Sequence, residues 1–356
     1  MLSEANFRTT RQAQWALLPI LFLLLSCATS QQPVDQSVQK TGLQPPKIVP
    51  PQIVPSIQSR SAPPILGINY IGIIGRPGQG AGQFLRPIGV ALDHRGALYV
   101  ADSGNNRIQV IDTDGNFITE FGQRGWRSGE FDQPTDVAIN FQGTEILYVV
   151  DTGNNRVQYC NLIDRIFHTM VGSSADYDSE NATENAGIEL DLPTGIGIGR
   201  NREVYVIDTG NNRFIRFDTK AFPELVRGSF GSASEQFRDP TDLVVDSHGN
   251  MYIVDSGNNR VKKYDFSGNL IKIWADGQFR HPAGIALDRW NYLYVTDQGN
   301  QRIQIFTSEG ESVMEFRAET LIEPAGIAIS KDDRVFVTDL AANNIKVFQI
   351  IYRPNP

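Results

Sequence analysis

Short apolar runs alternate with polar turns through most of the chain, and the same order of runs recurs six times between residues 66 and 356. Each unit opens with Pro-x-Gly or Pro-x-Asp leading into an apolar run, and after a short turn a second apolar run ends in aspartate. Runs rich in Val, Ile and Tyr, bounded by Gly, Asn and Asp, are typical of β-strands. A third and a fourth run follow, so each unit predicts four antiparallel strands, and their repetition indicates blades around an axis.

The opening runs are "PIGVALD" at 87, "PTDVAIN" at 134, "PTGIGIG" at 193, "PTDLVVD" at 240, "PAGIALD" at 282 and "PAGIAIS" at 324. The aspartates that end the second runs are Asp102, Asp151, Asp208, Asp255, Asp297 and Asp339.

The sixth unit contains only three strands before the chain reaches "FQIIYRPNP", whereas an extra strand, "INYIGIIG" at 68–75, precedes the first unit. An unfilled sheet edge leaves backbone groups unpaired, so this extra strand is expected to complete the last blade. We therefore predict an all-β fold: a six-bladed β-propeller of four-stranded antiparallel blades whose last blade is closed by the N-terminal strand 68–75.

One nine-residue motif is copied almost unchanged. "DSGNNRIQV" at 102–110 returns as "DTGNNRVQY" at 151, "DTGNNRFIR" at 208 and "DSGNNRVKK" at 255. Together with the preceding Pro-x-Gly strand, this segment resembles the hallmark of the NHL repeat family, and the resemblance covers residues 66–356. It implies a propeller that serves as a binding platform for protein or RNA or, in one relative, as the amidating lyase of peptide hormones.

That lyase holds zinc with several histidines that follow repeat prolines, whereas here only His281 is expected near the channel mouth. One histidine does not make a three-histidine zinc site. The sequence therefore predicts no metal, no cofactor and no assignable catalytic residue.

A motif copied this often indicates architecture, because an active site is built from residues that differ in role. We expect the aspartate to pair with the arginine that begins the third strand, the glycine to permit a positive φ, and the asparagines to close side-chain turns. The predicted pairs are Asp102–Arg107, Asp151–Arg156, Asp208–Arg213, Asp255–Arg260 and Asp297–Arg302. The sixth copy, "DLAANNIKV", has Ala341 and Asn344 in place of glycine and arginine, and is expected to be the loosest turn.

Residues 1–26 have the pattern of a lipoprotein signal peptide. Arg8 and Arg11 precede an uncharged run from Trp15 to Leu25, which is short for a membrane span of about 20 residues. The "LLSC" that ends at Cys27 resembles the bacterial lipobox, whose cysteine is lipidated, and two or more acyl chains anchor a protein stably. An uncleaved anchor, or an ordinary signal peptide with an incidental cysteine, is the alternative.

This resemblance implies export to a bacterial cell envelope with lipid on Cys27, and Ala28 after the cysteine favours the outer membrane in a Gram-negative cell. Residues 27–65 are rich in Pro and Gln and are predicted to be a lipid-anchored linker, with the NHL propeller at 66–356. The second cysteine, Cys160, aligns with apolar core positions and is expected to be buried and inert.

Charge narrows the range of partners. The formal net charge is −8 at pH 7 and basic runs are absent, which counts against nucleic acid as a partner. An acidic insertion at 173–189 explains the longest interval between repeats, and it is interpreted as a mobile acidic loop, with a calcium site as the alternative.

Function is expected where the sixfold symmetry is broken. The residues just before the repeat prolines should ring the channel mouth, and they differ in every unit: Arg86, Gln133, Leu192, Asp239, His281 and Glu323. Two residues after the proline, Asp136 and Asp242 replace the glycine of the other units. Solvated loop ends are the simpler interpretation of any single one of these side chains.

One loop adds an aromatic side chain to this asymmetry. "GQRGWRSGEF" at 122–131 places Trp126 between Arg124 and Arg127, with Arg76 and Arg86 expected in the adjoining sector. An exposed tryptophan flanked by arginines is typical of an interface anchor, and a tryptophan that only covers a blade edge is the alternative.

The sequence thus predicts a membrane-anchored, extracytoplasmic binding propeller that presents one face to a protein or envelope component. The alternative is a hydrolase or lyase, metal-assisted, whose carboxylate-rich channel mouth uses Asp136, Asp239, Asp242, His281 and Glu323.

Overall fold

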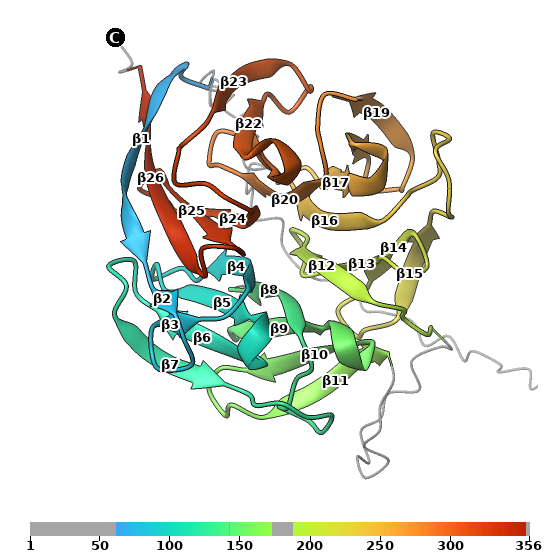
Figure 1. The fold of residues 1–356 in the computed structure, drawn as a ribbon. Coiled ribbons are helices and arrows are strands. Elements are labelled where there is room, and N and C mark those ends of the chain that lie inside the picture. The colour runs from blue at the N-terminus through green and yellow to red at the C-terminus, as the bar shows by residue number, and fades with distance from the viewer. Residues whose placement is uncertain (1–61, 142, 173–187, 276, 354–356) are drawn as a thin grey trace, which may run out of the picture. The chain divides into compact units, whose positions relative to one another are not determined.

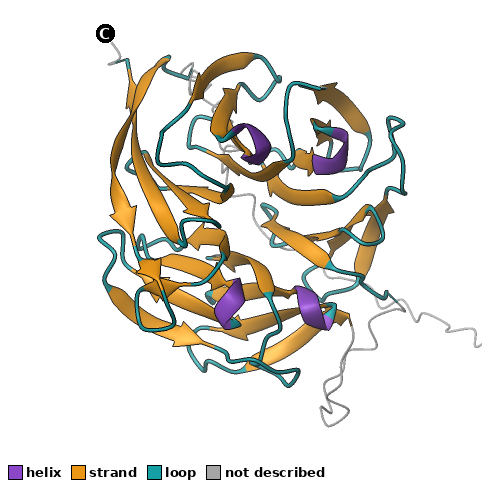
Figure 2. Cartoon of the chain, viewed as in Figure 1, coloured by secondary structure: helices purple, strands orange, loops and turns teal. Residues whose placement is uncertain are grey.

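The computed structural model describes residues 62–141, 143–172, 188–275 and 277–353. Within these residues the chain forms six four-stranded antiparallel sheets, placed as blades around a central axis (Figures 1 and 2). We call them blade I (β4–β7), blade II (β8–β11), blade III (β12–β15), blade IV (β16–β19), blade V (β20–β23) and blade VI (β24–β26 with β1). The predicted fold class is confirmed, including the use of the N-terminal strand to complete the last blade.

The strands follow the repeats closely. The innermost strands are β4 (Pro87–Leu92), β8 (Pro134–Asn140), β12 (Pro193–Ile198), β16 (Pro240–Val245), β20 (Pro282–Leu287) and β24 (Pro324–Ile329). The second strands are β5 (Leu98–Asp102), β9 (Ile146–Asp151), β13 (Val204–Asp208), β17 (Met251–Asp255), β21 (Leu293–Asp297) and β25 (Arg334–Asp339). The third strands are β6 (Arg107–Ile111), β10 (Arg156–Asn161), β14 (Arg213–Phe217), β18 (Arg260–Tyr264), β22 (Arg302–Phe306) and β26 (Asn344–Tyr352). The outer strands are β7 (Phe117–Phe121), β11 (Phe167–Gly172), β15 (Pro223–Arg227), β19 (Leu270–Trp274), β23 (Ser312–Phe316) and β1 (Ile65–Ile74).

Short elements mark the turns. A two-residue parallel pair, β2 (Arg76–Pro77) and β3 (Gln83–Phe84), lies in the loop that leads into blade I. Short 3-10 helices occupy four of the turns between second and third strands: η1 (Ser103–Asn105), η2 (Thr152–Asn154), η3 (Ser256–Asn258) and η4 (Gln298–Asn300). In blades III and VI the corresponding segments are turns without a 3-10 helix.

The core lies between neighbouring blades, because each sheet buries both faces. One core cluster joins Leu98 and Val100 of blade I to Phe336 and Val347 of blade VI, and it includes the fully buried Phe84. The innermost strands converge so closely that an added Cβ on Gly326 would lie 2.3 Å from the carbonyl oxygen of Ile88. The second strands are buried because a neighbouring blade packs on each of their two faces, and a closed ring provides such neighbours for all six blades.

The two ends of the propeller are held together in blade VI. Strand β1 pairs antiparallel with β26, which brings Ile68 opposite Ile350 and Ile74 opposite Ile345. The contact extends beyond the strand, because the backbone N–H of Arg353 donates to the carbonyl of Pro64 at 2.9 Å. The two ends of the propeller are thus joined by backbone hydrogen bonds, and β1 covers the edge of β26 as the outer strand of the last blade.

Candidate functional site

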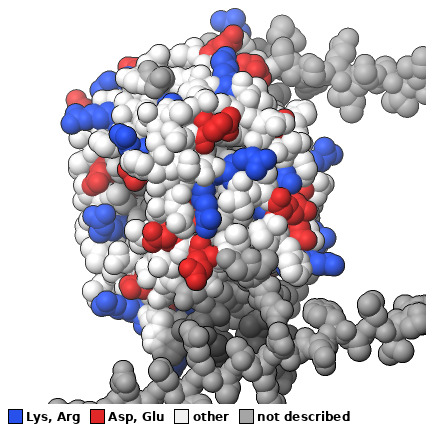
Figure 3. All heavy atoms as spheres, turned by 90° about the vertical axis from the view of Figure 1, so that its right-hand side faces the viewer, with Lys and Arg blue, Asp and Glu red and all other residues white. Residues whose placement is uncertain are grey.

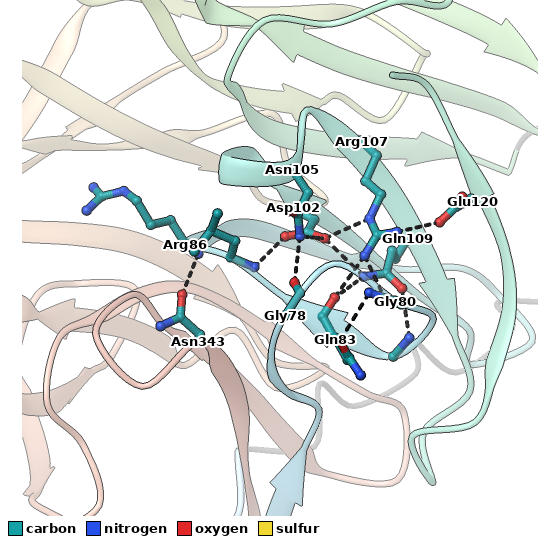
Figure 4. Close-up of polar contacts among 12 residues, drawn as sticks. Gly78, Gly80, Gln83, Arg86, Asp102, Asn105, Arg107, Gln109, Glu120 and Asn343 are labelled. Carbon is teal, nitrogen blue, oxygen red and sulfur yellow. Dashed lines mark hydrogen bonds and ion pairs between the residues drawn. The ribbon is translucent and has the colours of Figure 1, made fainter. Parts of the chain in front are cut away.

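The repeated motif forms a buried polar network in each blade. In blade I, Asp102 is fully buried, and its Oδ2 accepts hydrogen bonds from the side chains of Asn105, Arg107 and Gln109 at 2.8–3.0 Å (Figure 4). Its Oδ1 accepts the backbone N–H of Leu85 at 2.7 Å, which lies in the loop leading into the blade. The carboxylate therefore joins the turn between second and third strands to the preceding interblade loop.

Arginine completes the network from the other side. Arg107 Nη2 donates to the carbonyls of Gly80 and Gln83 in the interblade loop, and Nη1 pairs with Glu120 at 2.8 Å. The predicted aspartate–arginine pairing is found in all five copies, with Nε–Oδ2 distances of 2.6–2.8 Å. Because these side chains are used in internal hydrogen bonds, the motif has a structural role and leaves few polar groups free to bind a ligand.

The motif glycine does something other than the sequence predicts. Gly104 and its copies are absent from the positive-φ positions, whereas the second asparagine, Asn106, has φ 56°. The glycine is needed for close approach: its N–H donates to the Leu85 carbonyl at 2.8 Å, and a Cβ there would lie 2.7 Å from that oxygen. The expectation of a left-handed glycine was therefore wrong, because the asparagine takes that conformation.

The second asparagine also joins each blade to the next. Asn106 Oδ1 accepts the backbone N–H of Gln133 at 2.8 Å, and the same bond runs from blade II to III, III to IV, IV to V and VI to I. Between blades V and VI a glutamine, Gln301, replaces the asparagine and donates instead to the Ile322 carbonyl. We call the end of the propeller formed by these turns and the interblade loops the loop face.

The sixth copy of the motif lacks the arginine contact. Asp339 accepts the N–H groups of Ile322, Glu323 and Ala342, but Asn344 stands at the arginine position and its buried Oδ1 has no partner. Its turn contains no 3-10 helix, a feature it shares with blade III. The network at this turn is thus smaller than in the other blades.

The residues before the repeat prolines all lie on the loop face. Five of them adopt a left-handed backbone with φ between 44° and 50°: Arg86, Gln133, Leu192, Asp239 and His281. Their side chains are exposed, whereas Glu323 is half-buried. The asparagine bonds described above hold these strained residues in place, because each accepts the N–H of one of them.

The central cavity has a volume of about 460 Å³ and is lined mainly by apolar side chains of the innermost strands. Asp136 and Asp242 line it, whereas the six residues before the prolines do not. The structure therefore separates the proposed carboxylate-rich mouth into two groups: two aspartates inside the channel, and Asp239, His281 and Glu323 on the loop face.

Both channel aspartates are already bonded to backbone. Asp136 accepts the N–H groups of Val137 and Ile196, and Asp242 accepts those of Leu243 and Ile285, all at 2.7–2.9 Å. Burial, together with the nearby Asp242 carboxylate, raises the pKa of Asp136 well above its ordinary value. Burial raises the pKa of Asp242 to about 7. Both side chains are half-buried and line a mainly apolar cavity, so water stabilises their charges less than at the open surface.

The predicted tryptophan–arginine sector is exposed. The Trp126 side chain is 52% accessible, and the Arg127 guanidinium lies 5.5 Å from its ring centroid. Arg76, Arg86 and Arg124 are exposed, and no hydrogen bond or ion pair joins their guanidinium groups to another residue within the described ranges. Arg86 and Arg124 are brought together at one pocket of about 350 Å³ between blades I and II.

Sequence reasoning missed three residues of that pocket: Ser103, Asn106 and Asp132. Ser103 stands where blades II and III have threonine, so a comparison of the repeats at this position was the available signal. Elsewhere the surface is mixed, since Figure 3 shows acidic and basic side chains interspersed over the side that it presents.

The remaining candidates, the second cysteine and a metal site, offer no reactive group in the described residues. Cys160 is fully buried in the core shared by blades I and II, and burial raises the pKa of its thiol to about 11, which keeps it protonated and unreactive. Across the described part of the chain, no group of three or more His, Cys, Asp or Glu side chains is placed to hold a metal ion.

Several predictions fall outside the described residues. These are the signal peptide 1–26, the lipidation site Cys27, nearly all of the linker 27–65, and residues 173–187 of the acidic insertion. No helix in the described ranges is both long and apolar enough to cross a membrane.

Fold and motif together define the class: a six-bladed β-propeller that contains NHL repeats. The NHL repeat model matches residues 84–111, 237–264 and 279–306, which lie in blades I, IV and V. Among curated proteins, the chain is similar to Protein lin-41 of Caenorhabditis elegans, with 50% identity over 46 residues. That segment covers 13% of this chain and spans only 4% of the length of lin-41.

Solved structures share the fold at low sequence identity. A structural genomics protein of unknown function from Bacteroides thetaiotaomicron is 15% identical with a TM-score of 0.59, covering 80% of this chain and 76% of that chain. Virginiamycin B lyase from Staphylococcus aureus is 17% identical with a TM-score of 0.54, covering 82% of this chain and 89% of that one. At these identities the likeness concerns the fold alone.

Proposed function

We propose that this protein is an exported, lipid-anchored binding propeller whose loop face engages a protein or envelope component. The observation that carries the proposal is the contrast on that face. The side chains of the repeated motif are used in internal bonds, whereas Arg76, Arg86, Arg124 and the exposed Trp126 are left for a partner. Binding and scaffolding are typical of NHL propellers, which supports this assignment.

Export and anchoring are proposed from the N-terminal pattern that ends at Cys27. A Cys27→Ser variant is expected to lose lipid labelling, because serine offers no thiol to the lipid. A wild-type chain that stays in the membrane fraction without a lipid label, and with residues 1–26 still attached, would instead support the uncleaved anchor.

The test of binding is photo-crosslinking in intact cells from a reactive analogue placed at Trp126, followed by mass spectrometry of the adducts. A matched control places the same analogue at Ile163, which is 81% exposed and lies in the turn between β10 and β11 at the opposite end of the blade. A discrete adduct from position 126 and none from 163 is expected. Equal labelling from both positions, or none from either with the protein folded at the membrane, would refute the proposal.

The second candidate function is a hydrolase or lyase, and the observation that favours it is the pair of carboxylates with raised pKa in the central cavity. Against it, all four carboxylate oxygens already accept backbone N–H groups. Metal analysis and activity of Asp242→Ala separate the candidates. A stoichiometric ion and a reaction lost in this variant would establish the enzyme, whereas partner binding retained without metal would exclude it.

A further inference from the structure

The interface between blades I and II differs from its neighbours on the loop face. In blades II and III, Thr152 and Thr209 donate to the carbonyls of Pro193 and Pro240 in the next blade, at 2.7 and 2.8 Å. Ser103 holds this position in blade I and Ser256 in blade IV, and neither hydroxyl makes a hydrogen bond to any residue in the described ranges. Of these two serines, only Ser103 lies at a pocket with two arginines. Ser103 is only 5% exposed and lines the pocket, so its hydroxyl is available there as a hydrogen-bond donor.

Ser103 lines the pocket of about 350 Å³ between the two blades, together with Arg86 from blade I and Arg124 from the following loop. Figure 4 shows the Arg86 side chain extending away from the Asp102 network, with no contact drawn to its guanidinium. At the corresponding positions of the other described interfaces, two arginines do not occur together. Two unpaired guanidinium groups beside a free hydroxyl form a set of donors suited to a carboxylate.

Two further side chains restrict the ligand. Asn106 uses its Oδ1 to accept the Gln133 N–H, and its side-chain N–H groups have no hydrogen-bond partner in the described ranges. Asp132 also lines the pocket, and its side chain has no hydrogen-bond partner within the described ranges. A carboxylate at this place repels a dianion such as phosphate, but it accepts an N–H, so the pocket matches a group that presents a carboxylate beside an amide.

We propose that this pocket binds an acidic side chain of a partner polypeptide, with Arg86 and Arg124 on its carboxylate and Asp132 accepting a peptide N–H. The inference rests on the proposed binding function and names the chemistry of the partner. Trp126 is two residues from Arg124 in the same loop, where its exposed ring offers an apolar contact to the residues flanking the acidic side chain.

The direct test uses the purified full chain and a fluorescein-labelled, C-amidated peptide, Leu-Glu-Glu-Leu-Gly, with Leu-Gln-Gln-Leu-Gly as its uncharged control. Fluorescence anisotropy is expected to show binding of the glutamate peptide only. Arg86→Gln and Arg124→Gln should each weaken it about tenfold, and Ser103→Ala about threefold. Arg280→Gln is the matched control, since Arg280 is an exposed arginine of the interblade loop before blade V, outside the pocket, whose guanidinium has no hydrogen bond or ion pair in the described ranges; it should change affinity by less than about twofold.

The variants are compatible with the fold. Neither guanidinium has an internal partner, and Gln133 shows that glutamine is accommodated at the position of Arg86, since both residues have φ 50°. Unchanged thermal unfolding of Arg86→Gln would confirm this. Equal losses in Arg280→Gln, equal binding of the glutamine peptide, or stronger competition by inorganic phosphate than by acetate would each overturn the inference.

Crosslinking in cells separates this inference from the proposed function. An adduct from position 126 that disappears in the Arg86→Gln background supports both. An adduct of unchanged yield in that background retains the binding function but overturns the pocket as its acidic-residue site. No adduct in either background refutes the binding function itself, whatever the peptide shows.

Discussion

Removing the motif arginine of blade II tests how much the buried network contributes to stability. The Arg156 side chain is 1% exposed, and it donates to Asp151 at 2.7 Å and to the carbonyls of Arg127 and Glu130. Arg156→Met keeps the apolar stem but leaves the fully buried Asp151 without its countercharge, and it removes one of the two hydrogen-bond donors from each of the two loop carbonyls. Breaking a buried pair in this way costs about 3–5 kcal/mol.

The assay is urea unfolding of the full chain, followed by the fluorescence of the buried Trp274. Arg213→Met is expected to cost less, because the Arg213 side chain is 24% exposed and reaches a single loop carbonyl. Arg95→Met is the control, since its side chain is 71% exposed and its ion pair is long, at 3.6 Å; the expected loss is about 0–1 kcal/mol.

A double variant checks the mechanism. In Asp151→Asn/Arg156→Met the uncompensated charge is gone, so the loss should be smaller than the sum of the two single losses by about 1 kcal/mol or more. If Arg156→Met costs no more than Arg95→Met, the network is not a determinant of stability. Additive losses in the double variant would show that the two side chains act independently.

Three further outcomes follow from the contacts between blades. Asn259→Gly keeps the left-handed backbone but removes the acceptor of the His281 N–H. The His281 amide should therefore exchange its hydrogen with solvent about tenfold faster. An unchanged exchange rate would contradict the asparagine bond as a link between blades. Gly326→Ala places a Cβ 2.3 Å from a carbonyl oxygen of blade I and should lower the unfolding free energy by about 1–3 kcal/mol. In Gly67→Ala the new Cβ meets nothing within 4 Å, so this variant should be nearly neutral. Equal effects of the two variants would refute the close-packing argument. Because the pKa of Asp242 is raised from its ordinary value to about 7, the native state binds the proton more tightly than the unfolded state, and unfolding free energy should fall as pH rises from about 4 to 7. Asp242→Gly, which introduces the residue of the other blades, should flatten that slope in pH-dependent urea unfolding, and an unaltered slope would place the titration elsewhere.

Much of the fold could be predicted because it depends on residue patterns within short stretches of the chain. The apolar runs, the turn residues and the missing fourth strand led to the ring, and the pairing of β1 with β26 agrees with that prediction. The pairing of Asp102 with Arg107 was also accessible, since a hairpin brings residues five apart in the sequence opposite each other. These features depend on residues that are close together in the chain, so the sequence alone was sufficient to predict them.

The roles of the glycine and the second asparagine were not accessible in this way. Gly104 is required by Leu85 of the interblade loop, and Asn106 by Gln133 of the next blade, so both depend on how blades dock. The mouth residues were predicted as one group for the same reason, whereas the structure places Asp136 in the channel and Glu323 on the loop face.

The sequence by itself determined the number of blades, their strands and the closure of the ring, because backbone hydrogen bonding and apolar periodicity act over short stretches of chain. Only the tertiary structure decided which polar side chains make hydrogen bonds inside the propeller and which remain available to a partner. That selection depends on distances between blades: Ser103 and Thr152 occupy the same place in their repeats, yet only the threonine donates to the next blade, and the unused serine lies beside two unpaired arginines.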